Sequence, residues 1–235
     1  MYKTAYKNTI LRKMNPDDLR LLEDKMDRLR LPARMDLEHR GQPIEFVYFL
    51  ESGIATIVAR MPRGRDVEVG LIGFEGMTGT AAVLGDGCAA HECFMQMAGE
   101  GIRVPVAALT SAAERSDQLR SLLLRYIQSL YVQATYCALS NVRSRFEERL
   151  ARLLLRCHDR VIGDVLPLTH DVLAVMLGVR RPGVTLGLHV LEGEGLIRAS
   201  RGEITIRNRH GLIKRTNGSY GVPVAEYKRL IGTGK

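Results

Sequence analysis

Residues 168–206 constrain the fold more than any other stretch of the chain. Thr169 is a good N-cap residue for a short helix, and Asp171 in the first turn suits the positive end of the helix dipole. Gly178 then interrupts the helical pattern, and Pro182 lies where a second helix starts and its missing N–H costs no hydrogen bond. The stretch therefore predicts two short helices joined by a tight turn.

Each predicted helix has one apolar side. In the first helix these residues are Leu173, Val175, Met176 and Leu177. In the second, residues at spacings of four and three form a buried face: Val184, Leu188 and Leu191. Its other face is polar and basic, with Arg180, Arg181, Thr185 and His189. This arrangement is typical of the helix-turn-helix motif, whose second helix enters the major groove of DNA.

A small hairpin, or wing, follows the helix pair. Leu196–Ile197 and Ile204–Ile206 are apolar and flank the turn signal Ser200–Arg201–Gly202. Paired helices with a glycine turn also occur in helical proteins that never touch DNA. The wing and the arginines favour DNA binding over that alternative.

The net charge of +8 is distributed unevenly. Residues 1–107 hold 14 Lys and Arg against 15 Asp and Glu, whereas residues 108–160 hold 9 against 5 and residues 161–235 hold 11 against 6. A basic C-terminal part fits a phosphate-facing surface on one module, although a solvated basic face would look the same.

Other compositional features exclude several classes of protein. No apolar run approaches the roughly 20 residues of a membrane span, and the N-terminus lacks a secretory signal, so we expect a cytoplasmic protein without a membrane partner. Cys88, Cys93, Cys137 and Cys157 form no C-x-x-C pair, which disfavours a disulfide framework, a zinc site and an iron–sulfur cluster. We therefore expect free thiols, no metal and no evident cofactor.

The N-terminal part predicts one helix followed by strands. Asn15–Pro16–Asp17–Asp18 opens a helix that ends at Pro32, with an apolar face of Leu19, Leu22, Met26 and Leu29. From Ala33 to Pro105, glycines separate short apolar segments, which predicts a compact β-barrel or sandwich. Residues 46–50 and 54–58 flank a glycine turn and predict a hairpin.

A long helix is predicted from Leu109 to about Val142, where the chain has no glycine. Residues at spacings of four and three form a heptad seam: Leu119, Leu123, Tyr126, Leu130, Gln133 and Cys137. A helix of about 33 residues spans roughly 50 Å, longer than one small domain needs. We therefore expect it to pair with its copy in a second subunit; the alternative is a helix packed on its own β domain. Ser144 and Glu147 then form a capping box for the next helix.

The order of these parts resembles the cyclic-AMP receptor protein and FNR family of bacterial transcription regulators. The similarity covers almost the whole chain. Its most specific parts are T-H-D-V-L-A-V-M-L-G-V-R-R-P-G-V-T at 169–185 and E-G-E-G-L-I-R at 192–198, with V-Y-F-L-E-S-G-I-A at 47–55. The resemblance implies an α+β protein with an N-terminal cyclic-nucleotide-binding-like β-roll, or jelly roll, and a C-terminal winged helix-turn-helix. The expected boundaries are 1–108 for the sensory domain, 109–143 for the dimerisation helix, 144–215 for the DNA-binding domain and 216–235 for a tail.

The resemblance also implies partners. They are a second copy of the chain, double-stranded DNA and RNA polymerase, and the operator is near-palindromic with half-sites about 34 Å apart. Arg181 matches the family's base-reading arginine, which pairs bidentately with guanine. Further expected DNA contacts are Arg180, Thr185, His189, Arg201 and Thr169. Leu186 stands where the cyclic-AMP receptor protein has arginine, which implies a different target sequence.

The effector is not identified by the resemblance. Members that bind cyclic AMP use a glutamate and an Arg–Ser pair, and here Glu75 and Ala89–Ala90–His91 fall in those regions. Without a guanidinium a buried phosphate lacks its bidentate partner, so we do not expect cyclic-nucleotide binding of the usual kind. The candidate pocket residues are Thr78, Thr80, Ala89, Ala90, His91 and Thr135.

The leading hypothesis is therefore a homodimeric, sequence-specific DNA-binding transcription regulator. The alternative is a ligand-binding regulatory module that acts on protein partners. An enzyme is disfavoured because the chain has no recognisable nucleophile motif, P-loop or metal-ligand spacing.

Overall fold

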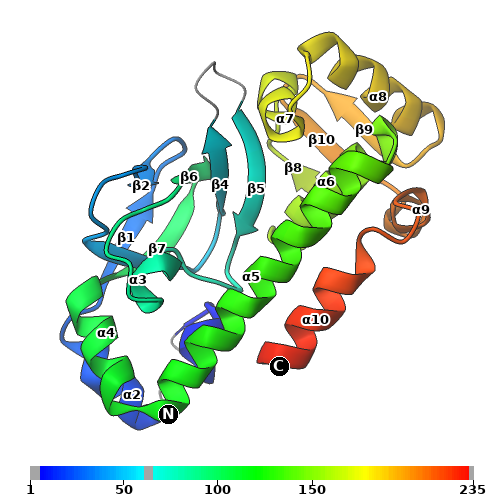
Figure 1. Cartoon of the computed structure of the whole chain (residues 1–235). Helices are drawn as coiled ribbons and strands as arrows, with labels where there is room; N and C mark the ends of the chain where they lie inside the picture. Colours follow the sequence, from blue (N-terminus) through cyan, green and yellow to red (C-terminus); the bar gives the residue numbers. More distant parts are fainter. Residues whose placement is uncertain (1–5, 61–65, 233–235) are drawn as a thin grey trace. The chain divides into compact units, whose positions relative to one another are not determined.

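The computed structural model describes residues 6–60 and 66–232 (Figure 1). Their contacts divide the chain into two compact units. Unit 1 combines residues 1–57, 72–131 and 226–235, and unit 2 combines residues 58–71 and 132–225.

Unit 1 begins with two short helices, α1 (Thr9–Lys13) and α2 (Pro16–Glu23). The Asn15 side chain caps α2 by accepting a hydrogen bond from the Asp18 N–H at 2.7 Å. The prediction that this helix continues to Pro32 is wrong, because β1 (Asp27–Leu31) follows it. In D-R-L-R-L the leucines alternate with charged residues, which is the period of a strand, and Leu31 is fully buried.

The strands of the β-roll form two sheets. The order of the first is β1–β7–β3, with β7 at Gly99–Pro105 and β3 at Phe46–Leu50. The order of the second is β2–β6–β4–β5, and its strands are Asp36–Glu38, Glu92–Met97, Ile54–Arg60 and Asp66–Ile72.

The predicted strands at 46–50 and 54–58 are present, but the predicted hairpin between them is wrong. β3 pairs antiparallel with β7, with Val47 opposite Val104, whereas β4 belongs to the other sheet. The turn at Gly53 therefore carries the chain from one sheet to the other. Gly53 has φ +78°, and a Cβ at this position would lie 2.6 Å from the Met97 carbonyl oxygen, so only glycine fits.

Two apolar cores stabilise unit 1. One lies among the strands and includes Leu31, Leu50, Ile72 and Met95. The other joins the helices to the sheet and includes Ile10, Leu11, Phe49, Met77, Leu109, Leu123 and Tyr126. The C-terminal tail contributes to the second core through Ile231, near the end of α10 (Gly221–Ile231). The Tyr227 hydroxyl also donates to the Glu75 carbonyl oxygen at 2.7 Å.

The predicted single helix from Leu109 to Val142 is divided in two. α4 covers Val106–Arg115 and α5 covers Asp117–Arg143, a helix of 27 residues. Ser116 between them has extended backbone, and its hydroxyl accepts a hydrogen bond from the Leu119 N–H at 3.1 Å. Ser116 thus ends one helix and caps the next.

Unit 2 contains the helix pair and the wing that the sequence predicts. α6 (Phe146–His158) precedes β8 (Val165–Leu166), α7 (His170–Leu177) and α8 (Arg181–Gly193). The wing strands β9 (Ile197–Ser200) and β10 (Glu203–Ile206) pair antiparallel, and α9 (Arg209–Arg215) follows. The cap of α6 lies one residue beyond the prediction, because Glu148 accepts from the Arg145 N–H at 3.0 Å.

The packing of α8 on α6 depends on a glycine. Gly187 is buried on α8, and an added Cβ would overlap the Phe146 ring and lie 3.2 Å from Leu150 Cδ2. Gly183, one turn earlier on the same helix, has open space around it.

We expect Gly187→Ala to lower the free energy of unfolding by about 1–3 kcal/mol, because it overpacks the contact between α6 and α8. The matched control Gly183→Ala should cost nothing, or gain up to about 1 kcal/mol, because alanine favours a helix. Urea unfolding followed by circular dichroism at 222 nm measures both changes. Equal midpoints for the two variants would contradict the packing argument.

Candidate nucleic-acid interface

The helix-turn-helix of unit 2 is built as its sequence predicts. Thr169 caps α7 by accepting a hydrogen bond from the Val172 N–H at 3.3 Å, and Gly178 ends it with φ +63°. The inner faces are buried, through Leu173, Met176, Leu177, Val184, Leu188 and Leu191. Val175 was also predicted on the apolar side of α7, but it is 46% exposed.

The first turn of α8 presents its side chains to solvent. Arg180 is the N-cap residue, and Arg181 and Pro182 open the helix. Arg180, Arg181 and His189 are exposed, and Leu186 is 66% exposed. The predicted contact residue Thr169 is exposed at the N-terminus of α7.

Two residues of α7 hold side chains of α8 in place. Asp171 Oδ1 lies 3.4 Å from Arg181 Nε, and both side chains are largely exposed. His170 Nδ1 lies 2.9 Å from the Thr185 hydroxyl, which is also 3.4 Å from the Arg181 carbonyl oxygen. The sequence analysis did not identify His170, because nothing in the T-H-D pattern shows that this side chain faces the next helix.

The wing places a further arginine at its tip. Arg201 is exposed in the turn between β9 and β10, where Gly202 has φ +81°. Arg198 on β9 and Arg207 after β10 are exposed as well. Arg198 is an addition to the predicted set, since its strand pattern alone did not indicate which face it occupies.

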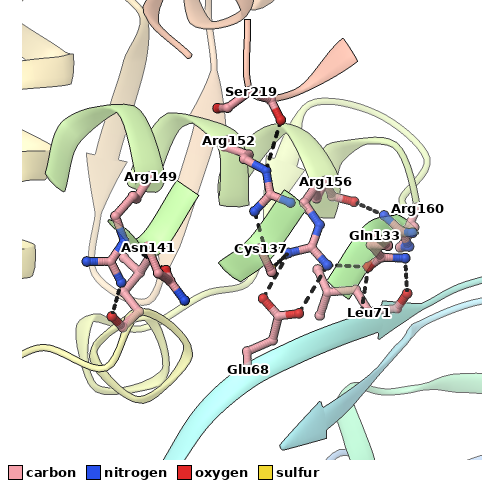
Figure 2. Close-up of polar contacts among 11 residues, drawn as sticks. Glu68, Leu71, Gln133, Cys137, Asn141, Arg149, Arg152, Arg156, Arg160 and Ser219 are labelled. Atoms are coloured by element: carbon pink, nitrogen blue, oxygen red, sulfur yellow. Dashed lines mark hydrogen bonds and ion pairs between the residues drawn. The ribbon is translucent and has the colours of Figure 1, made fainter. Parts of the chain in front are cut away.

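α6 fixes the end of α7 through Arg149 (Figure 2). Arg149 Nη2 donates to the Leu177 carbonyl oxygen at 2.5 Å, and Nε donates to Asn141 Oδ1 at 3.1 Å. Burial lowers the pKa of Arg149, although a guanidinium remains charged at any ordinary pH. The turn of the motif is thus tied to the helix beneath it.

The predicted dimer seam on α5 faces its own protomer, which corrects the prediction that it contacts a second copy. Leu119, Leu123 and Tyr126 are buried in the core of unit 1, and Leu130 packs against that core. The Tyr126 hydroxyl donates to the Met77 carbonyl oxygen at 2.9 Å and accepts from the Met77 N–H at 3.0 Å.

The remaining seam residues are buried in unit 2. Gln133 Oε1 accepts from the Leu71 N–H at 2.9 Å, and Cys137 accepts from two arginines. The alternative interpretation, a helix packed on its own chain, therefore describes this face of α5.

A different face of α5 is exposed and apolar. Leu124 is 40% exposed and Tyr131 is 67% exposed, seven residues apart, with the exposed Gln128 between them. Residues at the same helical spacing further along α5 are also exposed: Thr135, Ala138 and Val142.

The candidate effector residues lie in different surroundings. Thr78, Thr80, Ala89, Ala90 and His91 belong to unit 1, whereas Thr135 belongs to unit 2. Thr78 is buried, and its hydroxyl accepts from the Tyr48 N–H at 3.0 Å. Ala89 is also buried, while Ala90 and His91 are exposed.

A carboxylate that the sequence analysis missed lies beside these residues. Glu38 Oε1 accepts a hydrogen bond from the Gly79 N–H at 2.6 Å, next to Thr78 and Thr80. Burial raises the pKa of Glu38, and the hydrogen bond from Gly79 opposes part of that shift. A carboxyl group at this place makes the surroundings of Thr78 and Thr80 less favourable to a phosphate than a guanidinium would.

A cavity of about 420 Å³ lies elsewhere in unit 1. Its lining comes from α1, α2 and α5 and includes Lys13, Asp18, Asp117 and Arg125. None of the candidate effector residues lines it.

Residues 6–60 and 66–232 contain no group of three or more His, Cys, Asp or Glu side chains arranged to hold a metal ion. No helix in this part of the chain combines the length and the apolar character that crossing a membrane requires.

Comparison with known proteins identifies the helix-turn-helix domain. Residues 148–215 match the family model of the Crp-like helix-turn-helix domain. A search of the curated proteins gave no match.

Several solved structures share the fold. A protein from Eubacterium rectale assigned to the Crp/Fnr family of transcriptional regulators has a TM-score of 0.71 and 16% identity, covering 90% of this chain and 99% of that chain. FixK2 from Bradyrhizobium japonicum has a TM-score of 0.69 and 18% identity, covering 80% and 96%. The c-di-GMP-responsive regulator CLP from Xanthomonas campestris has a TM-score of 0.65 and 19% identity, covering 82% and 99%.

The exposed helix pair and the wing define a domain of the helix-turn-helix class. More particularly, the chain carries a Crp-like helix-turn-helix domain within the fold of the CRP/FNR-family transcription regulators. The resemblance stated from the sequence is thereby confirmed.

We expect Glu38→Gln to stabilise the protein increasingly as the pH rises. Well below pH 4.5 the carboxyl is protonated in both states and behaves like the amide. Above its ordinary value of 4.5 the unfolded chain ionises, whereas the raised pKa keeps the folded carboxyl protonated longer, so the wild type loses stability relative to the variant. Thermal unfolding from pH 4 to pH 8 measures the difference. Glu45→Gln, at an exposed site, is the control, and a Glu38→Gln difference that does not vary with pH would contradict the prediction.

Proposed function

We propose that this chain is a homodimeric, sequence-specific transcription regulator that reads DNA with α8 and senses an effector through the β-roll of unit 1. The observation that carries the proposal is the first turn of α8. It presents Arg180 and Arg181 to solvent on a buried apolar scaffold, in a Crp-like helix-turn-helix domain. The function implies RNA polymerase as a protein partner and the cytoplasm as the place of action.

Arg181 is the residue that we propose reads a base. Its partner Asp171 lies 3.4 Å away in an exposed pair, and such pairs are worth about 0–1 kcal/mol. A bidentate contact with guanine O6 and N7 is worth about 1–3 kcal/mol of discrimination. The guanine contact therefore outweighs the ion pair, and Asp171 serves to orient Arg181 before DNA arrives.

Two neighbouring side chains of α8 suit thymine. The Thr185 hydroxyl is already held by His170, which leaves the Thr185 methyl group for an apolar contact. Leu186 is exposed and apolar on the same helix. Apolar side chains in the major groove contact the thymine methyl group. Thr169, Arg180, His189 and Arg201 are proposed to contact phosphates, which position the protein on the duplex.

The exposed face of α5 is the surface that we propose for the second copy. Leu124 and Tyr131 recur at the seven-residue spacing of a helix pair, and both side chains are exposed. A dimer formed through α5 would carry two copies of α8, one for each half-site of the operator. Two half-sites that are one turn of DNA apart are separated by about 34 Å.

The Arg181 proposal is tested on a sequence that the wild-type protein selects from random duplexes. Arg181→Ala should weaken binding to that sequence by about 1–3 kcal/mol and relax the preference at one base pair per half-site. Arg180→Ala is the matched control, and it should weaken binding uniformly across sequences and reduce the salt slope by about one. Fluorescence anisotropy with single-base variants of the duplex measures both. A uniform loss for Arg181→Ala would assign this residue to a phosphate instead.

The dimer proposal is tested by adding charge to the exposed face of α5. The double variant Leu124→Glu with Tyr131→Glu should sediment as a monomer, because it places like charges opposite one another in the interface. Arg143→Glu lies about 100° away around the same helix and should stay dimeric. Sedimentation velocity with circular dichroism as a check on folding decides the matter, and a dimeric double variant would rule out this face.

A further inference from the structure

The cavity beside the start of α5 contains a buried carboxylate. The cavity has a volume of about 420 Å³, and residues of α1, α2 and α5 in unit 1 line it. Asp18 of α2 is one of these residues and is 3% exposed. Its backbone N–H donates to Asn15, but within residues 6–60 and 66–232 its carboxylate accepts no hydrogen bond and forms no ion pair. Neither oxygen is fully enclosed, so the carboxylate opens onto the cavity.

A carboxylate in such a place lacks a partner that buried charges ordinarily have. Taking a charge out of water costs free energy, and a partner of opposite charge or a set of hydrogen bonds offsets that cost. The volume of the cavity lies within the range of small-molecule sites, about 300–1,000 Å³. A ligand with a positively charged donor would therefore provide what Asp18 does not find in the described part of the chain.

The first turns of two helices meet at this cavity. Asn15 Nδ2, at the N-cap of α2, donates to Gln118 Oε1 in the first turn of α5 at 3.0 Å. Asp117, the first residue of α5, also lines the cavity. The positive end of a helix dipole amounts to about half an elementary charge, so Asp18 and Asp117 more than offset the two helix ends. These carboxylates disfavour a phosphate and favour an ammonium group.

Two basic residues bring positive charge to the same cavity. Arg125 follows Asp117 by eight residues on α5, about 12 Å along the helix axis. Arg125 is exposed and, among the residues that the structure describes, forms no ion pair. Lys13 lines the cavity from the end of α1. Positive and negative charges of the lining therefore balance, and a ligand with one charge of each sign matches them better than an anion or a cation.

Apolar side chains complete the lining. Met14, Leu119 and Leu122 are buried and belong to the core that joins the helices to the sheet. Ser121 and Gln118 add neutral groups that donate and accept hydrogen bonds. An apolar wall with a few polar groups is the usual composition of a small-molecule site.

We propose that this cavity binds a free amino acid with an apolar side chain. Asp18 and Asp117 bind its ammonium group, and Arg125 binds its carboxylate, an arrangement that guanidinium geometry favours. Leu119 and Leu122 contact its side chain. The site is separate from the residues considered for the β-roll effector, none of which lines the cavity. Its occupancy does not depend on DNA binding, so the two proposals stand or fall separately.

The full-length wild-type protein tests the proposal with probes that differ by one charge. Isothermal titration calorimetry with L-leucine, L-methionine and L-phenylalanine should detect binding of at least one of them. The tightest is then compared with its analogue without the ammonium group and its analogue without the carboxylate. For leucine these compounds are 4-methylpentanoate and 3-methylbutylamine. Each analogue should bind at least about tenfold more weakly, because one charged group of the protein loses its partner.

Two substitutions in the same turn of α2 separate the site from the helix dipole. Asp18→Asn keeps the shape of the side chain and removes the charge that faces the cavity. It should weaken amino-acid binding at least about tenfold and remove the preference over the analogue without the ammonium group. Asp17→Asn removes a charge from the same turn, but Asp17 is exposed, pairs with Arg20 and does not line the cavity. This control should bind like the wild type.

A second pair of variants tests the carboxylate contact. Arg125→Gln should remove the preference over the analogue without the carboxylate, whereas Arg120→Gln, at an exposed position of α5 outside the lining, should keep it. Circular dichroism at 222 nm checks the folding of each variant. Where Asp18→Asn fails to fold, the wild-type comparison of analogues still decides.

Three outcomes would overturn the proposal. The first is that no amino acid of the panel binds at concentrations up to about 10 mM. The second is that either analogue binds as tightly as the amino acid. The third is that Asp17→Asn and Asp18→Asn weaken binding equally.

Discussion

The buried ion pair between Arg156 and Glu68 fixes the centre of unit 2, with Arg156 Nη1 2.9 Å from Glu68 Oε2. Removing one partner of such a buried pair costs about 3–5 kcal/mol, because the other charge is left without compensation. The pair therefore holds the β5 segment against α6, and Gln133 and Cys137 add α5 to the same contact. α6 also contacts the helix-turn-helix. Leu150 and Phe146 pack against Gly187 of α8, and Arg149 donates a hydrogen bond to the end of α7. One helix thus supports both the charged cluster and the candidate DNA-reading surface.

Local chemistry explains which parts of the fold could be predicted from the sequence. Thr169, Gly178 and Pro182 act through caps, turns and the first helical turn, all of which depend on a few consecutive residues, and the structure places them as predicted. Strand pairing depends on distant residues. β3 and β4 are separated by three residues, yet β3 pairs with β7 some fifty residues later, so the predicted hairpin was wrong. The short strand β1 was not predicted, because Leu29 also fits the helical spacing of the residues before it.

The heptad spacing on α5 predicted a buried face but did not show which residues cover it. The seam from Leu119 to Cys137 was correctly placed on one face of α5, but the residues that cover it come from Met77, Leu71 and α6, far away in the sequence. The exposed face, with Leu124 and Tyr131, was missed because Gln128 and Thr135 interrupt its apolar pattern. The candidate DNA contacts were recognisable because basic residues at a helix N-terminus form a local pattern. His170 and Glu38 were not, since each acts on a residue of another element.

Arg152 and Arg156 both donate to Cys137, and this crowding of charges limits how the sequence can drift during evolution. Loss of the carboxylate at position 68 would leave two cations facing each other in a nonpolar interior, and a bulky apolar residue at position 137 would remove the acceptor from both. Positions 68, 137, 152 and 156 are therefore constrained as a set, so a neutral replacement at one is tolerated only when a neighbour changes with it. Four residues spread over about ninety positions of the chain thus form one set in physical terms.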